Sequence, residues 1–212
     1  MRNMNFCKPL GCVLATLLVL AGCSPPGART QAISHYVLEV PAAATPTVAL
    51  PTNAARPVLL LREAEPGGSS QSLRLVYSRA PGTLAQYQYA RWNEAPPKRL
   101  VTLLRQRLLA SGLYAGVVPL GSGVQGDYQL NIRLLNFFHN AVHTPGSAHV
   151  ALEAELVQRS TARLVGQQVF VADVQLAKQD AAAAASGLGQ ASGQVLDAVI
   201  AWLARVQPVD AR

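Results

Sequence analysis

The sequence predicts an α+β fold in which a largely antiparallel or mixed β-sheet carries two amphipathic helices on one face. Two observations predict it. Segments with strand-like alternation occur both before and after a leucine-rich helical segment, and a second apolar helical stripe ends the chain. We expect a single globular domain over residues 35–206, with residues 207–212 as a tail, behind an N-terminal targeting segment.

The targeting segment has the layout of a bacterial lipoprotein signal peptide. Arg2 and Lys8 precede an apolar run, residues 10–21, which is shorter than the ~20 residues that a membrane-spanning helix needs. The run ends in Leu-Ala-Gly-Cys, which matches the lipobox, so we expect removal of residues 1–22 and attachment of diacylglycerol and fatty acid (palmitate-type) chains at Cys23. Two or more acyl chains anchor a protein stably to a membrane. By resemblance to known lipoproteins, Ser24 in place of Asp favours the outer membrane, with the domain on its periplasmic face.

The cysteine positions and the charge make some functions of this chain improbable, namely thiol chemistry and nucleic-acid binding. Cys7 and Cys12 lie in the segment expected to be removed, so the mature chain has neither a disulfide nor a free thiolate. The chain is 50% hydrophobic and 14% charged, with a net charge of +7. This weak basic excess suits an anionic membrane or an acidic partner. Nucleic acid is not an expected partner, because there is no dense Lys/Arg run and only 6% of residues are aromatic.

The first half of the domain is predicted to be rich in strands. Residues 23–34 form a polar, proline-containing tether, and residues 41–57 form a Pro/Ala-rich loop. The Pro81-Gly82 turn between two strand-like segments predicts a hairpin. The segments with strand character here are residues 35–40, 58–63, 73–79 and 84–92.

The first predicted helix follows Asn93 and Glu94. Pro96 and Pro97 suit its first turn, and Gly112 suits the position after its end. Leucines recur every four residues on its apolar face, at Leu100, Leu104 and Leu108. Its other face is cationic through Lys98, Arg99, Arg105 and Arg107.

The second half predicts an antiparallel meander and a final helix. A short strand, residues 113–120, precedes three long alternating segments with short connections. The alternation slips near Asn136, where we expect a bulge. Residues 181–206 are predicted to be helical with an apolar stripe from Val195 onward, while the glycines in Ser-Gly-Leu-Gly-Gln-Ala-Ser-Gly favour a flexible loop or a frayed start. The long strand segments begin at Tyr128, Ser147 and Val165.

No catalytic or metal-binding motif is present in the sequence. His139, His143 and His149 could be brought together by a hairpin and bind zinc, but no carboxylate or cysteine is placed to complete such a site, so we expect no metal. Glu153 and Glu155 share a strand face, which is common on exposed strands, so we expect no catalytic residue and no cofactor.

The aromatic residues Tyr87, Tyr89 and Trp92 are the candidate partner contact. Either they form the edge of the core with polar tips in water, or they form a binding surface. They also belong to an ordered series of short motifs. That series contains the lipobox, Tyr36-Val37-Leu38, an arginine-containing strand with Arg74 and Arg79, the tyrosine-rich strand with Trp92 and Pro96, the leucine-rich helix, Leu113-Tyr114-Ala115-Gly116-Val117, and Asp127-Tyr128-Gln129-Leu130.

In this order the motifs resemble the ABC-type transport auxiliary lipoproteins, which include Pqi-type lipoproteins that accompany MCE-domain proteins. The resemblance implies a non-enzymatic, membrane-anchored accessory of a system that moves lipid or other hydrophobic molecules between membranes. Its implied partners are a periplasmic MCE-domain protein and an inner-membrane ABC or Pqi-type component. Two alternatives remain open: an assembly factor for outer-membrane lipopolysaccharide or protein machinery, and a periplasmic hydrolase. The cargo and the oligomeric state are left undefined.

Overall fold

The computed structural model describes residues 31–42, 56–63 and 72–206. The chain divides into two units, Met1–Ala32 and Ile33–Arg212, and the second contains every helix and strand described. Cys23, the signal peptide, most of the tether and of the 41–57 loop, and the C-terminal tail lie outside the described residues. Within the described part of the chain, no helix is long and apolar enough to cross a membrane.

The second unit has the predicted α+β architecture, with an eight-stranded mixed sheet and two helices. In chain order its elements are β1 (Ser34–Tyr36), β2 (Val58–Glu63), β3 (Arg74–Ser78), β4 (Ala85–Trp92), α2 (Pro96–Ser111), β5 (Gly116–Pro119), β6 (Tyr128–Asn140), β7 (Ser147–Gln158), β8 (Arg163–Gln175) and α3 (Ala181–Val206).

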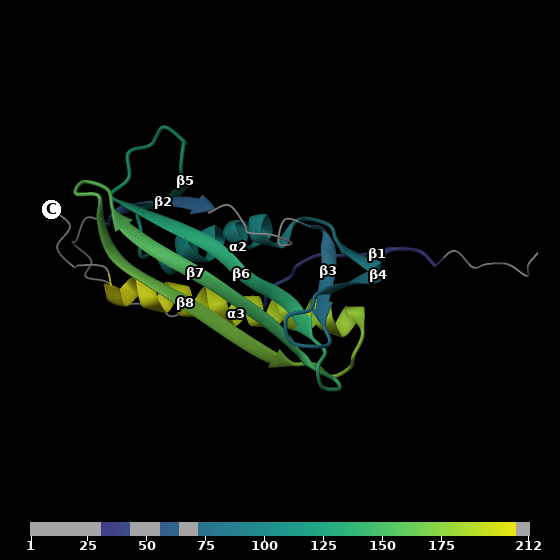
Figure 1. Ribbon diagram of the computed structural model, residues 1–212. Coiled ribbons are helices and arrows are strands. Elements are labelled where there is room, and N and C mark those ends of the chain that lie inside the picture. Colours follow the sequence, from purple (N-terminus) through teal and green to yellow (C-terminus); the bar gives the residue numbers. More distant parts are fainter. Residues whose placement is uncertain (1–30, 43–55, 64–71, 207–212) are drawn as a thin grey trace, which may run out of the picture. The chain divides into compact units, whose positions relative to one another are not determined.

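Strand β6 organises the sheet. One of its edges pairs along its whole length with β7, which in turn pairs with β8, so the predicted antiparallel meander is confirmed. The other edge is shared: β2 pairs in parallel with residues 128–132, and β3 pairs in parallel with His139 and Asn140. The sheet therefore divides into two arms, β2–β5 and β3–β4–β1, at the two ends of β6 (Figure 1).

The alternation in the meander predicts the buried face correctly. In β7 the buried residues Val150, Leu152, Ala154 and Leu156 point toward the helices. The predicted bulge is confirmed as a register shift between Leu134 and Asn136 in β6. A bulge returns the following apolar residues to the inner face, which keeps the long strand amphipathic.

Both helices cover the same face of the sheet. Helix α2 begins with Pro96 and ends at Ser111, and the next residue, Gly112, has a φ of +69°, the left-handed conformation that favours glycine after a helix. Helix α3 packs across β7 and β8, with Trp202 against Phe170 at a ring-centroid distance of 5.8 Å. The two helices and the inner face of the sheet enclose one hydrophobic core.

Two predicted elements are corrected. The first strand ends at Tyr36, and residues 37–42 continue as an extended segment outside the sheet. The glycine-containing stretch 186–193 is neither a loop nor a frayed start, because it lies inside α3 and Gly187, Gly189 and Gly193 are buried. These glycines let α3 pack closely against the segment that follows β1.

Candidate functional site

The predicted contact strand β4 contains a large bulge. Arg74 pairs with Arg91 and Val76 pairs with Gln86, so two steps along β3 correspond to five along β4. The side chain of Arg91 folds back over the extra residues and donates hydrogen bonds to the carbonyl oxygens of Tyr87 (2.9 Å) and Ala90 (2.8 Å), and a longer one to that of Gln88 (3.4 Å). Since carbonyl groups in a bulge lose their ladder partners, Arg91 satisfies them and holds the bulge in shape.

Tyr89, one of the three predicted contact residues, lies in this bulge. It is 38% exposed to solvent. Strand β1 pairs in parallel with β4, with Ser34 opposite Ala90. The preceding residue, Ile33, therefore lies beside Tyr89, and it is 49% exposed. Val37, just after β1, is 50% exposed. We call Ile33, Val37, Tyr89 and Arg91 the β1–β4 surface.

Tyr87 and Trp92 point inward from the same strand. Trp92 is 1% exposed and packs on Phe137 of β6 at a ring-centroid distance of 5.7 Å, so its ring is part of the core. Tyr87 is half-buried against Tyr77, whose ring centroid lies 5.0 Å away. Of the three predicted contact residues, Tyr89 is the most exposed.

A buried hydrogen-bond chain joins β4 to the β6–β7 hairpin. The Nε2 atom of His139 lies 3.2 Å from the carbonyl oxygen of Pro145, which can only accept, so Nε2 carries the proton. The unprotonated Nδ1 then accepts a hydrogen bond from the Tyr87 hydroxyl at 2.7 Å. His139 is fully buried, and this burial lowers its pKa, against the opposing effects of the Pro145 carbonyl and Asp180. Burial, with Asp180 and Tyr77 nearby, raises the pKa of Tyr87 to about 12.

The three predicted histidines are not brought together. His139 and His149 pair with neighbouring positions across the hairpin, Ala148 and Phe138, and therefore point to opposite faces of the sheet. His149 instead bonds to Asp173, with Nδ1 and Oδ1 2.9 Å apart, and His143 is exposed in the hairpin. The described part of the chain contains no group of three potential metal ligands.

The two glutamates are used in contacts on the outer face of the sheet. Glu153 forms a salt bridge with Arg133 at 3.3 Å and accepts a hydrogen bond from Gln167 at 2.7 Å. Glu155 lies two residues further along β7 and is partly buried. These contacts are those of an ordinary polar sheet surface.

The segment Leu38–Pro41, which we call the strap, crosses between α2 and α3. An added Cβ at Gly189 would lie 2.1 Å from the Glu39 carbonyl oxygen, and one at Gly193 would lie 3.1 Å from Val40 Cγ1. Only glycine lets the strap backbone approach α3 this closely. The glycines of α3 thus form the bed of the strap, which is the correction to their predicted role as a flexible loop.

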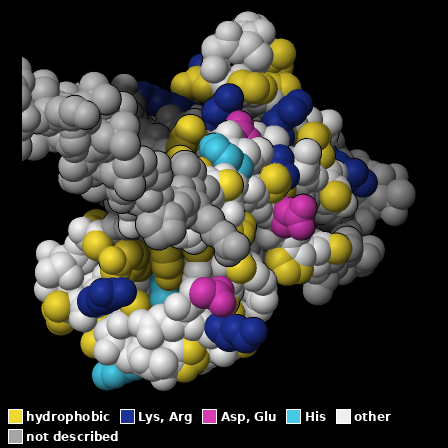
Figure 2. Space-filling view, turned by 90° about the vertical axis from the view of Figure 1, so that its right-hand side faces the viewer, with side chains coloured by type: hydrophobic (Ala, Val, Ile, Leu, Met, Phe, Trp, Pro, Cys, Tyr) yellow, Lys and Arg dark blue, Asp and Glu magenta, His cyan; other side chains and the backbone are white. Residues whose placement is uncertain are grey.

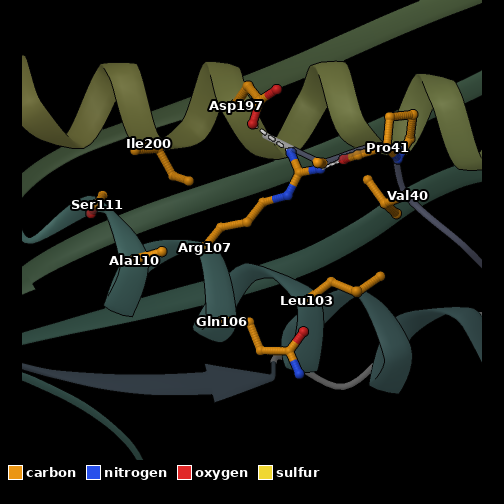
Figure 3. Close-up of a pocket in the computed structure, with 10 residues that line it drawn as sticks. Val40, Pro41, Leu103, Gln106, Arg107, Ala110, Ser111, Asp197 and Ile200 are labelled. Atoms are coloured by element: carbon orange, nitrogen blue, oxygen red, sulfur yellow. Dashed lines mark hydrogen bonds and ion pairs between the residues drawn. The ribbon is translucent and has the colours of Figure 1, made fainter. Parts of the chain in front are cut away.

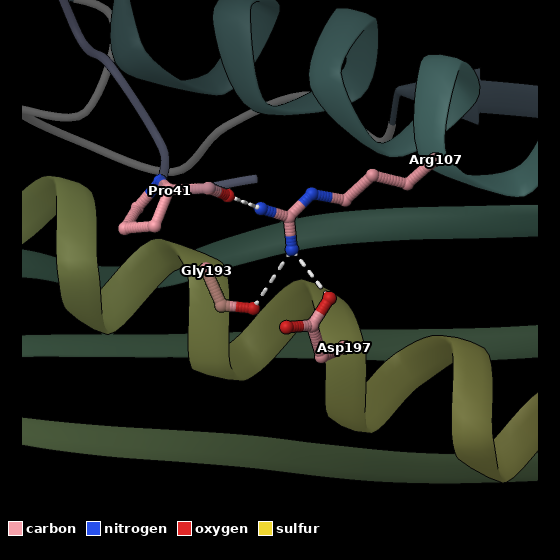
Figure 4. Close-up of polar contacts among 4 residues, drawn as sticks. All are labelled: Pro41, Arg107, Gly193 and Asp197. Carbon is pink, nitrogen blue, oxygen red and sulfur yellow. Dashed lines mark hydrogen bonds and ion pairs between the residues drawn. The ribbon is translucent and has the colours of Figure 1, made fainter. Parts of the chain in front are cut away.

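Arginines of α2 hold the strap from the other side. Arg107 donates to the carbonyl oxygens of Pro41 and Gly193, the latter at 3.2 Å, and forms an ion pair with Asp197 of α3 (Figure 4). Arg99 donates from Nε to the Leu38 carbonyl oxygen at 3.2 Å. The side chain of Arg107 is 10% exposed, so its charge is desolvated and needs these acceptors.

Two grooves lie on either side of the strap. One, of about 370 Å³, lies between α2 and α3 and is lined mostly by apolar side chains, among them Val40, Leu103 and Ile200 (Figure 3). The other, of about 430 Å³, lies between the strap and the first half of α3, with Glu39 and Ser186 on its wall. The strap thus divides the surface of α3 into two shallow hollows rather than lying on a smooth face.

Sequence reasoning missed the strap contacts. Arg107 was predicted to lie on the wet face of its helix, yet its guanidinium is mostly buried against α3. Its partner Asp197 is 90 residues away in the chain, so no local pattern indicates the pairing. The signal that could have found the strap bed is the spacing of Gly189 and Gly193, which places two small residues on one face of a helix.

Solved structures share this fold. Protein XCC0632 from Xanthomonas campestris, of the DUF330 family, superposes with a TM-score of 0.71 at 24% identity, covering 82% of this chain and 96% of that one. The crystal structure of an uncharacterized protein superposes with a TM-score of 0.58 at 16% identity, covering 81% of this chain and 99% of that one. A comparison with curated protein sequences finds no match.

The sequence of the folded unit also matches a family. The match covers residues 36–200, which run from the last residue of β1 to the buried stripe of α3 and so include the contact strand, the strap and its glycine bed. The family's members are auxiliary components of transport systems, which is an accessory rather than a catalytic role. This chain belongs to the family of ABC-type transport auxiliary lipoprotein components.

Proposed function

We propose that this chain is a lipid-anchored accessory subunit of an ABC- or MCE-type system that moves lipid or another hydrophobic compound between membranes. Cys23 carries the lipid, the anchor lies in the outer membrane, and residues 35–206 form the docking domain in the periplasm. The domain binds an MCE-domain protein, which connects it to an ABC or Pqi-type component of the inner membrane. The family match and the motif order of the sequence support this assignment.

The observation that carries the docking role is the exposed Tyr89 in the bulge of β4. An exposed aromatic ring costs free energy in water unless a partner covers it, and rings with few rotatable bonds lose little entropy on binding. The bulge is held by three hydrogen bonds from Arg91, so the ring is presented on a rigid support. Ile33 and Val37 extend the apolar area around it.

The edge of the sheet adds a second binding element. Strand β1 is the last strand of its arm, and its other edge pairs with no strand in the described part of the chain. A free edge can accept an extended segment of another protein by backbone hydrogen bonding, while neighbouring side chains select the sequence. We therefore propose that an extended segment of the MCE-type partner lies along β1 with an apolar side chain against Tyr89.

The test is capture of a co-expressed MCE-domain protein by the full-length chain. Tyr89→Ala removes the exposed ring and should weaken capture about ten-fold or more, because central aromatic anchors often contribute ~2 kcal/mol. Because Tyr89 is 38% exposed and partly packed in the folded chain, we expect the melting temperature of the variant to fall by no more than a few degrees. Leu164→Ala is the matched control, because Leu164 is 51% exposed on β8, far from β1 in the sheet order.

The outcome separates the candidate functions. Normal capture by the Tyr89→Ala variant would remove the β1–β4 surface from the proposal while leaving the accessory role. Failure of the wild type to capture any MCE-domain protein, together with capture of an outer-membrane β-barrel machine, would favour the assembly-factor alternative.

A further inference from the structure

Three connections meet at one end of the domain. The turn between β3 and β4 and the hairpin between β6 and β7 are joined by a hydrogen bond from the Ala141 amide to the Ser78 carbonyl oxygen at 2.7 Å. The connection from β8 to α3 joins the same hairpin through the Leu176 amide and the Gly146 carbonyl oxygen at 2.9 Å. We call the exposed residues of these three connections the tip, and Figure 2 faces this end of the molecule.

The tip combines exposed apolar and cationic side chains. Leu84 is 58% exposed and Val142 is 42% exposed, each in a turn rather than on the sheet. Arg79 and Lys178 are exposed in the same set of connections, and neither forms a salt bridge with a described residue. Figure 2 shows hydrophobic side chains on this face, with Lys/Arg and acidic side chains interspersed among them.

The acidic groups near the tip are already engaged. The Asp180 carboxylate accepts a hydrogen bond from the Ala183 amide at 2.7 Å, where it caps the start of α3. The Asp173 carboxylate is paired with His149. Arg79 and Lys178 are therefore the charged groups of the tip that no ion pair among the described residues engages, and the Arg79 guanidinium is held in place because it lies over the Tyr77 ring at 5.0 Å.

The first strand of the folded unit is oriented along the same direction. Strand β1 runs parallel to β4 beside its last residues, Ala90–Trp92, and β4 runs away from the β3–β4 turn, so the N-terminal end of β1 points toward the tip. The nine residues from Ser24 to Ala32 can span at most roughly 30 Å. The length of β6, about 40 Å for its 13 residues, separates the tip from the opposite end of the domain.

We infer that the tip rests on the anionic surface of the lipid bilayer in which the chain is anchored. The inference rests on the proposed lipid anchor at Cys23. Arg79 and Lys178 contact the phosphate groups of lipid heads, while Leu84 and Val142 enter the boundary between head groups and acyl chains. Such a pairing of exposed apolar side chains with cations suits a membrane interface. The contact fixes the orientation of the domain, with the β2–β5 arm pointing away from the membrane.

Tryptophan fluorescence in vesicles tests the contact. The two native tryptophans are buried, Trp92 at 1% and Trp202 at 4% exposure, so they give a constant background. Leu84→Trp places a reporter on the tip, and Val124→Trp places a matched reporter at 47% exposure in the loop before β6, at the opposite end. Both full-length variants are purified from membranes with their lipid and reconstituted in vesicles of phosphatidylcholine and phosphatidylglycerol, some with bromine on the acyl chains.

Bromine quenches only fluorophores that reach the bilayer. We expect the added emission of the Leu84→Trp variant to fall at least two-fold in brominated vesicles, and that of the Val124→Trp variant to stay unchanged. Adding Arg79→Glu and Lys178→Glu to the Leu84→Trp variant should remove at least half of its quenching. Absence of quenching in a Leu84→Trp chain that floats with the vesicles would overturn the tip contact alone, whereas a chain that lacks the lipid and does not float would overturn the anchor as well.

Discussion

Adding one methyl group at Gly189 should loosen the strap. In an ordinary helix, Gly→Ala stabilises the fold by about 1 kcal/mol, because alanine has the higher helix propensity. At Gly189 the new Cβ would lie 2.1 Å from the carbonyl oxygen of Glu39, which belongs to backbone and cannot rotate away. The strap must then move by roughly an ångström to restore van der Waals separation.

The cost of that movement exceeds the gain. Overpacking a close contact costs about 1–3 kcal/mol. Moving the strap also disturbs the hydrogen bond from Arg107 to the Pro41 carbonyl oxygen, and hydrogen bonds from charged groups contribute about 1.5–3 kcal/mol. After the helix propensity gain, we expect a net loss of about 1.5–5 kcal/mol, which lowers the melting temperature by roughly 3–20 °C for a domain of this size.

Thermal unfolding followed by circular dichroism measures the effect. Ser186→Ala is the matched control, because it also places alanine in α3 but at an exposed position one turn earlier, and its melting temperature should be unchanged or slightly higher. Gly193→Ala should fall between the two, since its nearest neighbour is a side-chain methyl at 3.1 Å that can shift. A Gly189→Ala protein that melts at or above the wild-type temperature would refute the close approach of strap and helix.

Other substitutions test the remaining contacts. Trp92→Ala should cost about 3–5 kcal/mol of stability, measured by urea unfolding, because it empties a core site; a loss below about 1 kcal/mol would contradict the burial of the ring. The pKa of His139 is lowered in the fold, so the unfolded chain binds more protons and stability should decrease as pH falls below about 6.5 toward the folded-state pKa; His139→Gln should flatten this part of the melting profile, and an unchanged profile would assign it to another group. Arg107→Lys should restore little of the stability lost in Arg107→Met, because one ammonium group cannot reach acceptors on both the strap and α3; equal stability of the lysine variant and the wild type would refute the two-sided contact. Cys23→Ser should abolish incorporation of labelled palmitate, and equal labelling of the mutant would remove the lipobox assignment.

The elements of the meander, α2 and the second half of α3 could be predicted because their signals are local. The strand period of two in β7 correctly separates Leu152 from Glu153, and the proline and glycine positions correctly bound α2. The slip of alternation near Asn136 predicts the bulge for the same reason. In each case, neighbouring residues carry the pattern that the backbone geometry imposes.

The contact strand was harder to interpret. Tyr87 and Tyr89 alternate, but Trp92 follows Tyr89 at an interval of three, which a regular strand does not bring to the same face. The structure resolves this with a bulge held by Arg91, so Trp92 points into the core and Tyr89 points to solvent. The interval of three residues from Tyr89 to Trp92 is the signal in the sequence that could have shown this. It indicates that the strand is interrupted and that the three aromatic rings do not form one row.

For the candidate zinc cluster, the sequence could not decide whether the histidines come together. His139 and His149 could share a site only if the register of the two strands placed both side chains on the same face of the sheet. The register of β6 and β7 pairs His139 with Ala148, so the two rings face opposite sides of the sheet. A turn of one residue more or less would reverse that outcome, and the sequence does not specify the turn length closely enough.

By itself, the sequence determined most of the strand and helix segments and which of their faces are apolar. It also determined the family to which the chain belongs. These properties depend on residues that are close together in the chain. The tertiary structure alone decided the parallel placement of β1, β2 and β3, the bed that α3 provides for the strap, and the pairing of Arg107 with Asp197. Those contacts join residues that are far apart in sequence. Their partners are selected by the shape and charge of surfaces that exist only once the sheet and helices have packed.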